Sequence, residues 1–417
     1  MGMRQDLDQL MREQKIDALW VMGALMNNPN MTYFTGIHNV NNADLFKVRG
    51  NDPVLYHFVD MEREEARKST LETHSYFSEK SLGSYLEENN GDLAKSTATR
   101  IKEALHEVGL KSGQIAISGM IDLGYGFSII ELLREMCPQF TLISFLKDSP
   151  IETVRMTKNP DEVESVRKMG EITRDVVAKV QNFLQSQKTI NQTLVFPNGS
   201  PVTVGNVKSQ IDLWLAELGA DSPEETIFSI GKDSAVPHNR GNLDDEIKLG
   251  VPIVFDIFPC EKGGGYFYDF TRTWCLGYAS EEITNLHKQV LEVHHKVIES
   301  LEAGQFFKKA QDRTCQLFSE MGHITIADNS KTQSGYLHSV GHGIGLNVHE
   351  KPFSGSTASP DDLLIPGVIF TIEPGLYFPE KEVGIRIEDT LYLNENKQFE
   401  ILADYPYDLV IPMNEKL

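Results

Sequence analysis

Two segments of the sequence each place a pair of carboxylates in an expected β-hairpin. The first is VPIVFDIFPCEKGGGYFYDFTRTW at residues 251–274, where apolar and aromatic runs flank a glycine-rich turn. Asp256 and Asp269 interrupt these runs, and their midpoint falls inside the turn. A symmetric hairpin therefore sets the two carboxylates nearly opposite one another, where like charges destabilise a strand pair. Such a pair needs a chemical reason.

The later segment VIFTIEPGLYFPEKEVGIRIEDTLYL, residues 368–393, repeats the arrangement with Glu373 and Glu388. Their midpoint lies at Glu380–Lys381, again inside the turn. An exposed polar face would explain one such pair, but two pairs embedded in apolar strands indicate burial. A buried carboxylate is costly unless it is neutralised or meets a cation. Two divalent cations would balance about four converging negative charges, so the sequence predicts a metal site.

Oxygen-rich ligation with no thiolate suits Mn²⁺ or Co²⁺ better than a cysteine-rich zinc site. The segment HSVGHGIGLNVHE, residues 338–350, offers nitrogen ligands. His338 and His342 are four residues apart, as in a helical zinc motif, but the interspersed glycines favour loop and strand. On a strand, His342 and His349 face opposite sides unless the glycines bend the backbone. Structural histidines held against glycine turns are the alternative.

The composition is that of a globular protein with room for two domains. The chain has 417 residues, of which 40% are hydrophobic and 24% charged, and its formal net charge is 39 − 60 = −21. An acidic chain without a Lys/Arg cluster is a poor candidate for binding nucleic acid or an anionic membrane.

The cysteines and the apolar segments indicate where the protein resides. The four cysteines show no CxxC spacing, which favours free thiols in a reducing compartment. The longest apolar stretch, residues 18–26, is too short to cross a bilayer, and the charged segment before it is unlike a signal peptide. We therefore expect a cytoplasmic protein.

Residues 1–150 alternate helical and strand patterns, which predicts an α/β layer domain. Helices are expected within 6–17, 93–109 and 126–139 and strands within 18–23, 53–60, 114–119 and 140–145, while PNMTYFTGI at 29–37 indicates a turn into a short strand. This region contains no cluster of His, Asp and Glu.

Residues 151–417 predict a second domain in two similar halves. A capping box at Asn159, with Glu162 reaching back, begins a helix. A second helix is expected over 204–218, followed by the first hairpin. Helices over 283–301 and 307–321 precede the second hairpin. Two helices and a hairpin, twice over, suggest an α+β domain with an internal pseudo-two-fold repeat.

These motifs together resemble the pita-bread metallopeptidases, and most closely the branch of Xaa-Pro aminopeptidases and prolidases. The matching segments are DFTRT, GHGIGLNVHE, TIEPGLY and GIRIEDT, with SAVPHNR upstream. The segments IDALWVMG and NMTYFTGI resemble the creatinase-type N-terminal domain of this branch. The resemblance implies a creatinase-type domain over 1–150 and a pita-bread catalytic domain over 151–417.

The resemblance also implies a site with two divalent metal ions, Mn²⁺ first, with Co²⁺, Zn²⁺ and Fe²⁺ as alternatives. The implied metal ligands are Asp256, Asp269, His342, Glu373 and Glu388. Glu373 would also accept a proton from the nucleophile, a hydroxide that bridges the metals. His238 and His349 would bind substrate and stabilise the tetrahedral intermediate, while His338, Tyr377 and Arg386 would line the substrate site. For Arg386, an ion pair that orients Glu388 is an equal alternative.

The activity that the resemblance implies is hydrolysis of the bond preceding proline in short peptides by a homodimer. The chain departs from the family in three places: the first hairpin is about two residues longer, Phe258 replaces a glycine, and no arginine lies between His349 and Glu373. Dipeptide-cleaving relatives often hold the substrate carboxylate with such an arginine, so its absence favours an aminopeptidase, unless Lys351 or a partner subunit serves. A prolidase, a creatinase-like hydrolase of a non-peptide C–N bond and, more distantly, a non-catalytic binding module are the alternatives.

Overall fold

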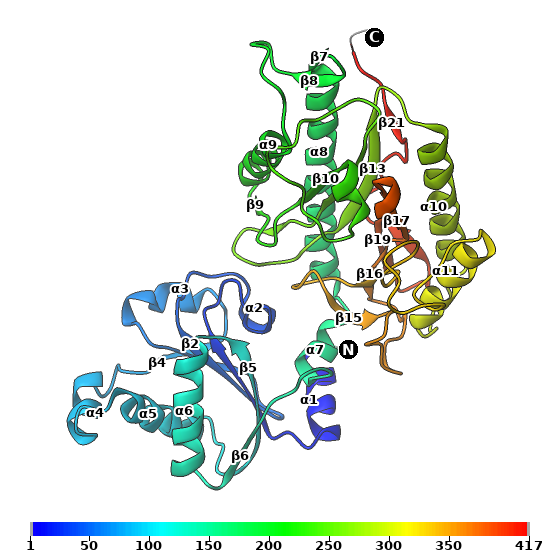
Figure 1. The fold of residues 1–417 in the computed structure, drawn as a ribbon. Helices are drawn as coiled ribbons and strands as arrows, with labels where there is room; N and C mark the ends of the chain where they lie inside the picture. The colour runs from blue at the N-terminus through cyan, green and yellow to red at the C-terminus, as the bar shows by residue number, and fades with distance from the viewer. Residues whose placement is uncertain (1–2, 415–417) are drawn as a thin grey trace. The chain divides into compact units, whose positions relative to one another are not determined.

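The computed structural model describes residues 3–414, with side chains from residue 7 onward, and divides the chain into two compact units (Figure 1). One unit comprises the chain up to Arg155 together with Gly263–Gly265, and the other comprises Met156–Lys262 and the chain from Tyr266 onward. Within residues 3–414, no helix combines the length and the apolar composition that a membrane crossing requires.

The first unit is a mixed β-sheet covered by helices on both faces, in the strand order β4-β3-β2-β1-β5-β6. The strands are β1 (Ala18–Gly23), β2 (Ala43–Val48), β3 (Val54–His57), β4 (Glu72–Ser75), β5 (Gly113–Met120) and β6 (Phe140–Ile143). The helices are α1 (Met3–Glu13), α2 (Pro29–Thr35), α3 (Arg63–Arg67), α4 (Leu82–Glu88), α5 (Leu93–Glu107), α6 (Leu123–Met136) and α7 (Pro150–Arg155), with a 3₁₀ turn η1 (Asp60–Glu62).

Strand β1 shows why this unit needs helices on both faces. Trp20 and Met22 pack into the core beneath α5 and α6, whereas Leu19 and Val21 pack into cores on the opposite face. A strand buried on both faces is apolar throughout, which explains the continuous run ALWVMG.

The segment at 29–37 corrects one sequence-based expectation, because it forms helix α2 and not a strand. The Asn28 side chain accepts a hydrogen bond from the Met31 amide, and Pro29 occupies the first helical turn. This cap fixes the helix start and outweighs the strand preference of the aromatic and β-branched residues that follow.

The second unit has two halves, each with a pair of long helices over a sheet. The first half contains α8 (Pro160–Ser186), α9 (Val204–Glu217), β7 (Lys188–Ile190), β8 (Thr193–Val195), β9 (Ala220–Asp221), β10 (Ile227–Ile230), η2 (Gly231–Ala235), β11 (Pro252–Ile257), β12 (Cys260–Glu261) and β13 (Phe270–Leu276). Helix α8 begins with the predicted capping box at Asn159 and Glu162.

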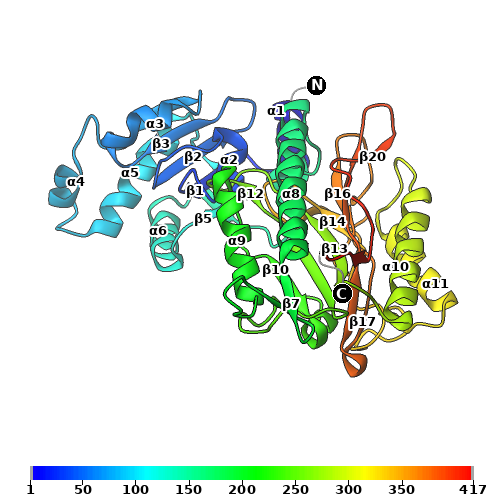
Figure 2. The same ribbon diagram turned by 90° about the horizontal axis from the view of Figure 1, so that it is seen from above.

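The second half repeats this order. It contains α10 (Glu281–Glu299), α11 (Lys308–Glu320), β14 (His342–Gly343), β15 (Glu350–Phe353), β16 (Ile369–Ile372), β17 (Gly375–Phe378), η3 (Pro379–Lys381), β18 (Val383–Arg386), β19 (Asp389–Leu393), β20 (Phe399–Ile401) and β21 (Val410–Ile411). The two main sheets have the orders β10-β11-β13-β21 and β15-β14-β16-β19-β20. Figure 2 shows the pairs α8/α9 and α10/α11 on opposite sides of these strands, as the predicted pseudo-two-fold repeat requires.

Candidate metal centre

The two hairpins of the second unit meet where their carboxylates lie. An isolated β-bridge joins Thr271 to Glu388, and the Glu388 amide donates to the Thr271 carbonyl oxygen at 3.0 Å. The Thr271 hydroxyl donates to Glu388 Oε2 at 2.7 Å. These bonds fix the start of β13 against the residue that precedes β19, so that one wall of the site is built from both halves.

The second hairpin has the predicted register. Ile372 pairs with Asp389 and Gly375 pairs with Arg386, which sets Glu373 directly across from Glu388. The turn η3 lies at the predicted midpoint.

The first hairpin differs from the prediction by two residues. Asp256 pairs with Thr271 and not with Asp269, so the two carboxylates are diagonal neighbours on the same face. The pairing is symmetric about Gly263 and Gly264, both of which have positive φ angles, 94° and 85°. Glycine adopts these angles without strain, and this fixes the turn one position later than the carboxylates alone suggest.

His342 and His349 lie side by side, because the glycine-rich segment does not run as a regular strand. Their ring centroids are 4.2 Å apart. The ladder between β14 and β15 shifts register between His342 and Gly343. A Cβ on Gly343 would lie 2.0 Å from the Lys351 carbonyl oxygen, so only glycine permits this approach.

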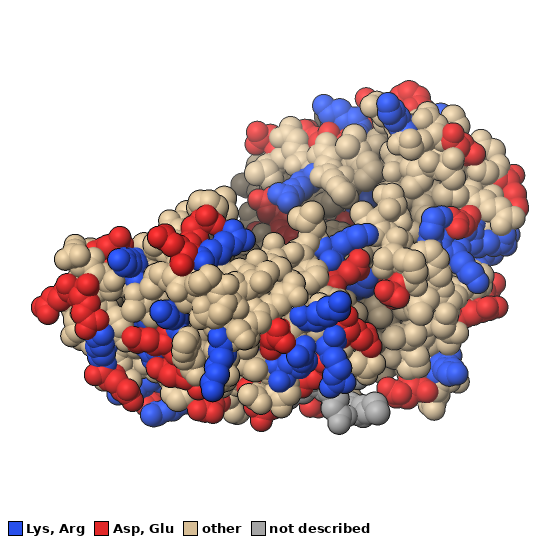
Figure 3. All heavy atoms as spheres, turned by 90° about the horizontal axis from the view of Figure 1, so that it is seen from below, with Lys and Arg blue, Asp and Glu red and all other residues tan. Residues whose placement is uncertain are grey.

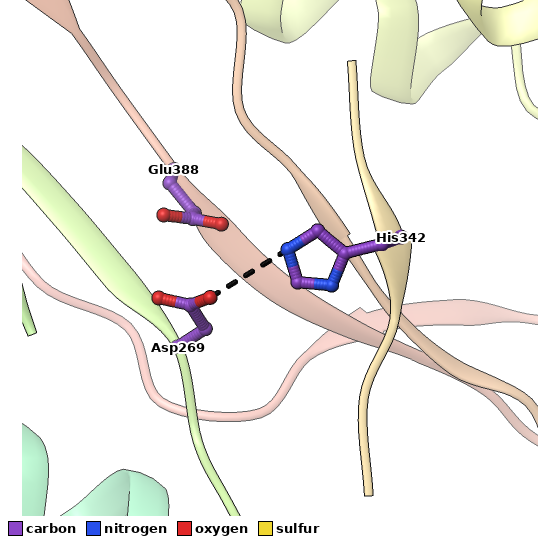
Figure 4. Close-up of side chains that lie close together, drawn as sticks. All are labelled: Asp269, His342 and Glu388. Carbon is purple, nitrogen blue, oxygen red and sulfur yellow. Dashed lines mark ion pairs between the residues drawn. The ribbon is translucent and has the colours of Figure 1, made fainter. Parts of the chain in front are cut away.

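Asp269, His342 and Glu388 form a cluster suited to a metal ion (Figure 4). One ligand atom from each lies within 4.8 Å of the others, and all three residues are buried. His342 Nε2 is 3.6 Å from Asp269 Oδ2 and also 3.6 Å from Glu373 Oε1. Glu373 therefore lies next to the cluster, on the side of His342. Asp256, on β11, lines the same cavity as these residues.

Three of the carboxylates at this site each have one oxygen that lacks a hydrogen-bond partner among the described residues. Among the described residues, the buried atoms Asp256 Oδ1, Asp269 Oδ1 and Glu388 Oε1 accept no hydrogen bond. A buried, unsatisfied carboxylate oxygen is unfavourable unless a cation binds it. Oxygen donors with an imidazole nitrogen suit divalent ions such as Mn²⁺, so these residues fit a metal centre.

Burial dominates the acid–base behaviour of the cluster. It raises the pKa of Glu388 to about 8, and the negative charge of Asp256 adds to the rise. Burial, followed by the charge of Glu388, also holds the pKa values of Asp269 and Glu373 well above their ordinary range. Burial lowers the pKa of His342 to about 3, which leaves its imidazole neutral and able to bind a metal at neutral pH.

Arg386 links the carboxylate of Asp256 to the side chains of Tyr377 and His338 through hydrogen bonds. Its Nη2 donates to Asp256 Oδ2 at 2.5 Å, and its Nη1 donates to the Tyr377 hydroxyl at 2.8 Å. His338 Nε2 lies 2.9 Å from the same hydroxyl. Further donors of Arg386 reach Thr271 Oγ1 and the Pro237 carbonyl oxygen. Arg386 therefore orients Asp256, and its donors are almost fully used within the protein.

A cavity of about 410 Å³ opens onto the cluster. It is lined by all five proposed metal ligands and by His238, His338, His349 and Arg386. Tyr377 does not line it, because its fully buried side chain lies behind His338 and Arg386. His349, whose pKa burial lowers, is the histidine whose ring lies against that of His342 at an interplanar angle of 54°.

The cavity also contains residues to which the sequence assigned no role. Arg240 and Glu224 line it, and both side chains are exposed. Arg240 Nη1 lies 3.5 Å from Glu225 Oε2, a long surface ion pair. Phe258, which replaces the usual glycine, forms part of the wall as predicted. The sequence offered one sign that Arg240 lies at the site, namely its position two residues after His238.

Lys351, the sequence-based candidate for binding a substrate carboxylate, does not line the cavity. It is buried, and its Nζ lies 3.2 Å from Asp362 Oδ1 and 3.2 Å from Ser359 Oγ. A buried ammonium already paired with a buried carboxylate is not available to a substrate.

Comparison with known families agrees with this fold. The profile of metallopeptidase family M24 matches residues 164–395, more than half of the chain, and the profile of the creatinase/prolidase N-terminal domain matches residues 3–157. The chain therefore belongs to metallopeptidase family M24, with a creatinase-type N-terminal domain, and the resemblance drawn from the motifs is confirmed.

Individual relatives carry two kinds of name. A Mycoplasma pneumoniae protein with the provisional name Xaa-Pro aminopeptidase is 28% identical over 316 residues, covering 75% of this chain and 77% of the relative. The Xaa-Pro dipeptidase of Pyrococcus furiosus is 26% identical over 297 residues, covering 70% and 75%. The crystal structure of a dipeptidase from Pyrococcus horikoshii OT3 superposes with a TM-score of 0.75 at 21% identity, covering 98% of this chain and 99% of that one. This likeness confirms the predicted fold class.

Proposed function

We propose that this protein is a metal-dependent Xaa-Pro aminopeptidase, which hydrolyses the peptide bond before proline and releases the N-terminal residue. The observation that carries the proposal is the group of unpartnered carboxylate oxygens beside a neutral His342 at the base of a cavity. The names of the M24 relatives supply the preference for proline.

The proposed cofactor is a pair of divalent ions, Mn²⁺ first, which would lower the pKa of a water molecule and polarise the scissile carbonyl. Asp256, Asp269, His342, Glu373 and Glu388 would hold them. Glu373 lines the cavity and is the residue we assign to take up a proton from the attacking water.

The histidines of the cavity have separate proposed roles. His238 and His349 would contact the substrate and stabilise negative charge on the carbonyl oxygen. His338 and Tyr377 would act through Arg386, which orients Asp256. Because burial lowers the pKa of His338 to about 3, its ring stays neutral at physiological pH.

The engagement of Lys351 by Asp362 supports the aminopeptidase over the dipeptidase, because Lys351, the expected substitute for the missing arginine, does not line the cavity. One observation favours the dipeptidase as a second candidate. Arg240 lines the cavity, and among the described residues its guanidinium pairs with Glu225 alone, through a long and exposed contact, so it could receive a substrate carboxylate.

Cleavage of three peptides by chelator-treated protein, with and without Mn²⁺, tests these proposals. Metal-dependent release of alanine from Ala-Pro-Ala but not from Ala-Ala-Ala supports the aminopeptidase. Cleavage of Ala-Pro alone supports the dipeptidase. If no peptide is cleaved although metal is bound, a non-peptide amide becomes the substrate class to examine.

Two variants test the roles proposed for Glu388 and Arg240. Glu388→Ala should abolish Mn²⁺ binding and turnover while the N-terminal domain stays folded, and retained turnover would refute the proposed metal centre. Arg240→Gln should raise the KM for Ala-Pro only if Arg240 binds the carboxylate. Arg313→Gln, at a partly exposed position on α11 outside the cavity lining, is the matched control.

A further inference from the structure

We propose that the buried ion pair between Arg272 and Asp389 is a positioning device that sets the separation and orientation of Asp269 and Glu388. This inference rests on the metal centre proposed above. It assigns a role to two charged residues that lie outside the cavity and touch neither substrate nor metal.

The pair lies directly behind the two ligands. Side chains alternate along a strand, and Thr271 faces Glu388 on the cavity side. Arg272, the next residue on β13, therefore faces away from the cavity. Asp389 follows Glu388 and faces the same way, so that Arg272 Nη2 donates to Asp389 Oδ1 at 2.8 Å.

The guanidinium of Arg272 uses all of its donors on this wall of the site. Nη1 donates to the carbonyl oxygens of Thr271 at 3.0 Å and Glu388 at 2.8 Å. Nη2 also donates to the Tyr405 carbonyl oxygen at 2.9 Å, and Nε donates to that of Pro406 at 3.1 Å. A single side chain thus connects both ligand-bearing strands to the C-terminal segment.

Burial and ring packing hold this guanidinium in one place. The side chains of Arg272 and Asp389 are 1% and 0% exposed. The Arg272 guanidinium carbon lies 4.3 Å from the ring centroids of both Phe270 and Tyr407. The Tyr407 hydroxyl donates to Asp389 Oδ2 at 2.7 Å, and His294 Nε2 lies 3.3 Å from the same oxygen.

The geometry links this pair to the metal ligands through short chains of atoms. Arg272 holds the backbone oxygen of Glu388, whose carboxylate accepts from Thr271, and Thr271 is itself held by Arg272 through its carbonyl oxygen. A change in the position of the Arg272 guanidinium would therefore move the Glu388 carboxylate relative to Asp269. Groups behind metal ligands commonly change metal affinity by about 10–100-fold when altered.

Arg272→Lys is the first test, because lysine keeps the charge but cannot make five bonds in a planar fork. We expect the variant to stay folded, to bind Co²⁺ at least about tenfold more weakly than wild type, and to show a changed Co²⁺ visible absorption spectrum. With Ala-Pro-Ala, kcat should fall more than KM changes. Arg167→Lys, in a partly exposed ion pair with Glu400, is the matched control.

The double variant Arg272→Met/Asp389→Leu separates positioning from simple stability, because an apolar pair of similar volume often preserves folding. If it folds as stably as wild type but keeps the weakened Co²⁺ affinity and altered spectrum, the positioning role stands. Wild-type affinity and spectrum in either folded variant would overturn it. Absence of Co²⁺ binding by the wild type would instead refute the metal centre. If both variants fail to fold, Asp389→Asn is judged by the same two readouts.

Discussion

Glu388 should destabilise the metal-free protein as pH rises, and Glu388→Gln should remove that effect. Burial, followed by the charge of Asp256, raises the pKa of Glu388 to about 8 from 4.5. The folded chain therefore keeps a proton that the unfolded chain loses between these two values. The unfolding free energy contributed by this group is present at low pH and falls as pH rises through the window.

Over the interval from pH 6.5 to 8, the difference between wild type and Glu388→Gln isolates this effect. Burial lowers the pKa values of His338 and His342 to about 3, so each still adds about 0.4 kcal/mol of stability above pH 6.5, where the unfolded histidine is half protonated, and this gain is common to wild type and Glu388→Gln. One pH unit corresponds to about 1.4 kcal/mol per proton that differs between the folded and unfolded states. Glu388 alone should therefore lower the free energy of unfolding by about 1–2 kcal/mol across this interval. Asp269 and Glu373, whose pKa values burial also raises, act with the same sign.

Urea denaturation followed by tryptophan fluorescence, at several pH values and with a chelator present, measures the slope. The metal-free wild type should lose stability from pH 6.5 to 8, and Glu388→Gln should lose less. With Mn²⁺ the wild-type slope should reverse, because the metal requires ionised ligands and stabilises only the folded state. Glu320→Gln, exposed on α11, is the control. A metal-free wild type that loses no more stability over this interval than Glu388→Gln would refute the reasoning.

Three other substitutions test how the site is supported. Gly341→Ala places a Cβ 1.9 Å from the Thr371 carbonyl oxygen, so unfolding measurements should show a loss of about 3 kcal/mol or more, and no loss would contradict the close approach. Lys158→Met removes the ammonium that lies 2.6 Å from the buried carboxylate of Glu350 and should lower the unfolding free energy by about 3–5 kcal/mol. The double variant Lys158→Met/Glu350→Leu should recover most of the unfolding free energy that the single variant loses. Phe258→Ala widens the cavity, so the ratio of kcat/KM for Leu-Pro-Ala to that for Ala-Pro-Ala should rise about tenfold; an unchanged ratio would remove Phe258 from specificity.

Local signals allowed the helices of the second unit to be predicted from the sequence. The capping box at Asn159 begins α8 where expected, because both of its hydrogen bonds form within one turn. The helix at 29–35 was missed for the opposite reason. Its cap is a lone Asn28 followed by residues that favour strands, and only burial of Met31 and Thr32 completes it.

The carboxylates were predictable because their residue type conflicts with their apolar surroundings, whereas their register was not. A slip of one residue moves a side chain to the other face, but a slip of two keeps it on the same face. The alternation around Asp256 and Asp269 therefore fits either register. The choice between them depends on where two adjacent glycines turn, which the pattern of apolar residues does not contain.

Strand parity distinguishes two arginines that otherwise have similar contexts in the motifs. Arg386 precedes Glu388 by two positions, so both side chains reach the cavity, and the guanidinium binds Asp256. Arg272 follows Asp269 by three positions and faces away, as does Asp389, one position after Glu388. Counting along the strands would therefore have placed Arg272 and Asp389 together behind the ligands. It would not have shown that they bond, because that depends on the bridge that joins the two hairpins.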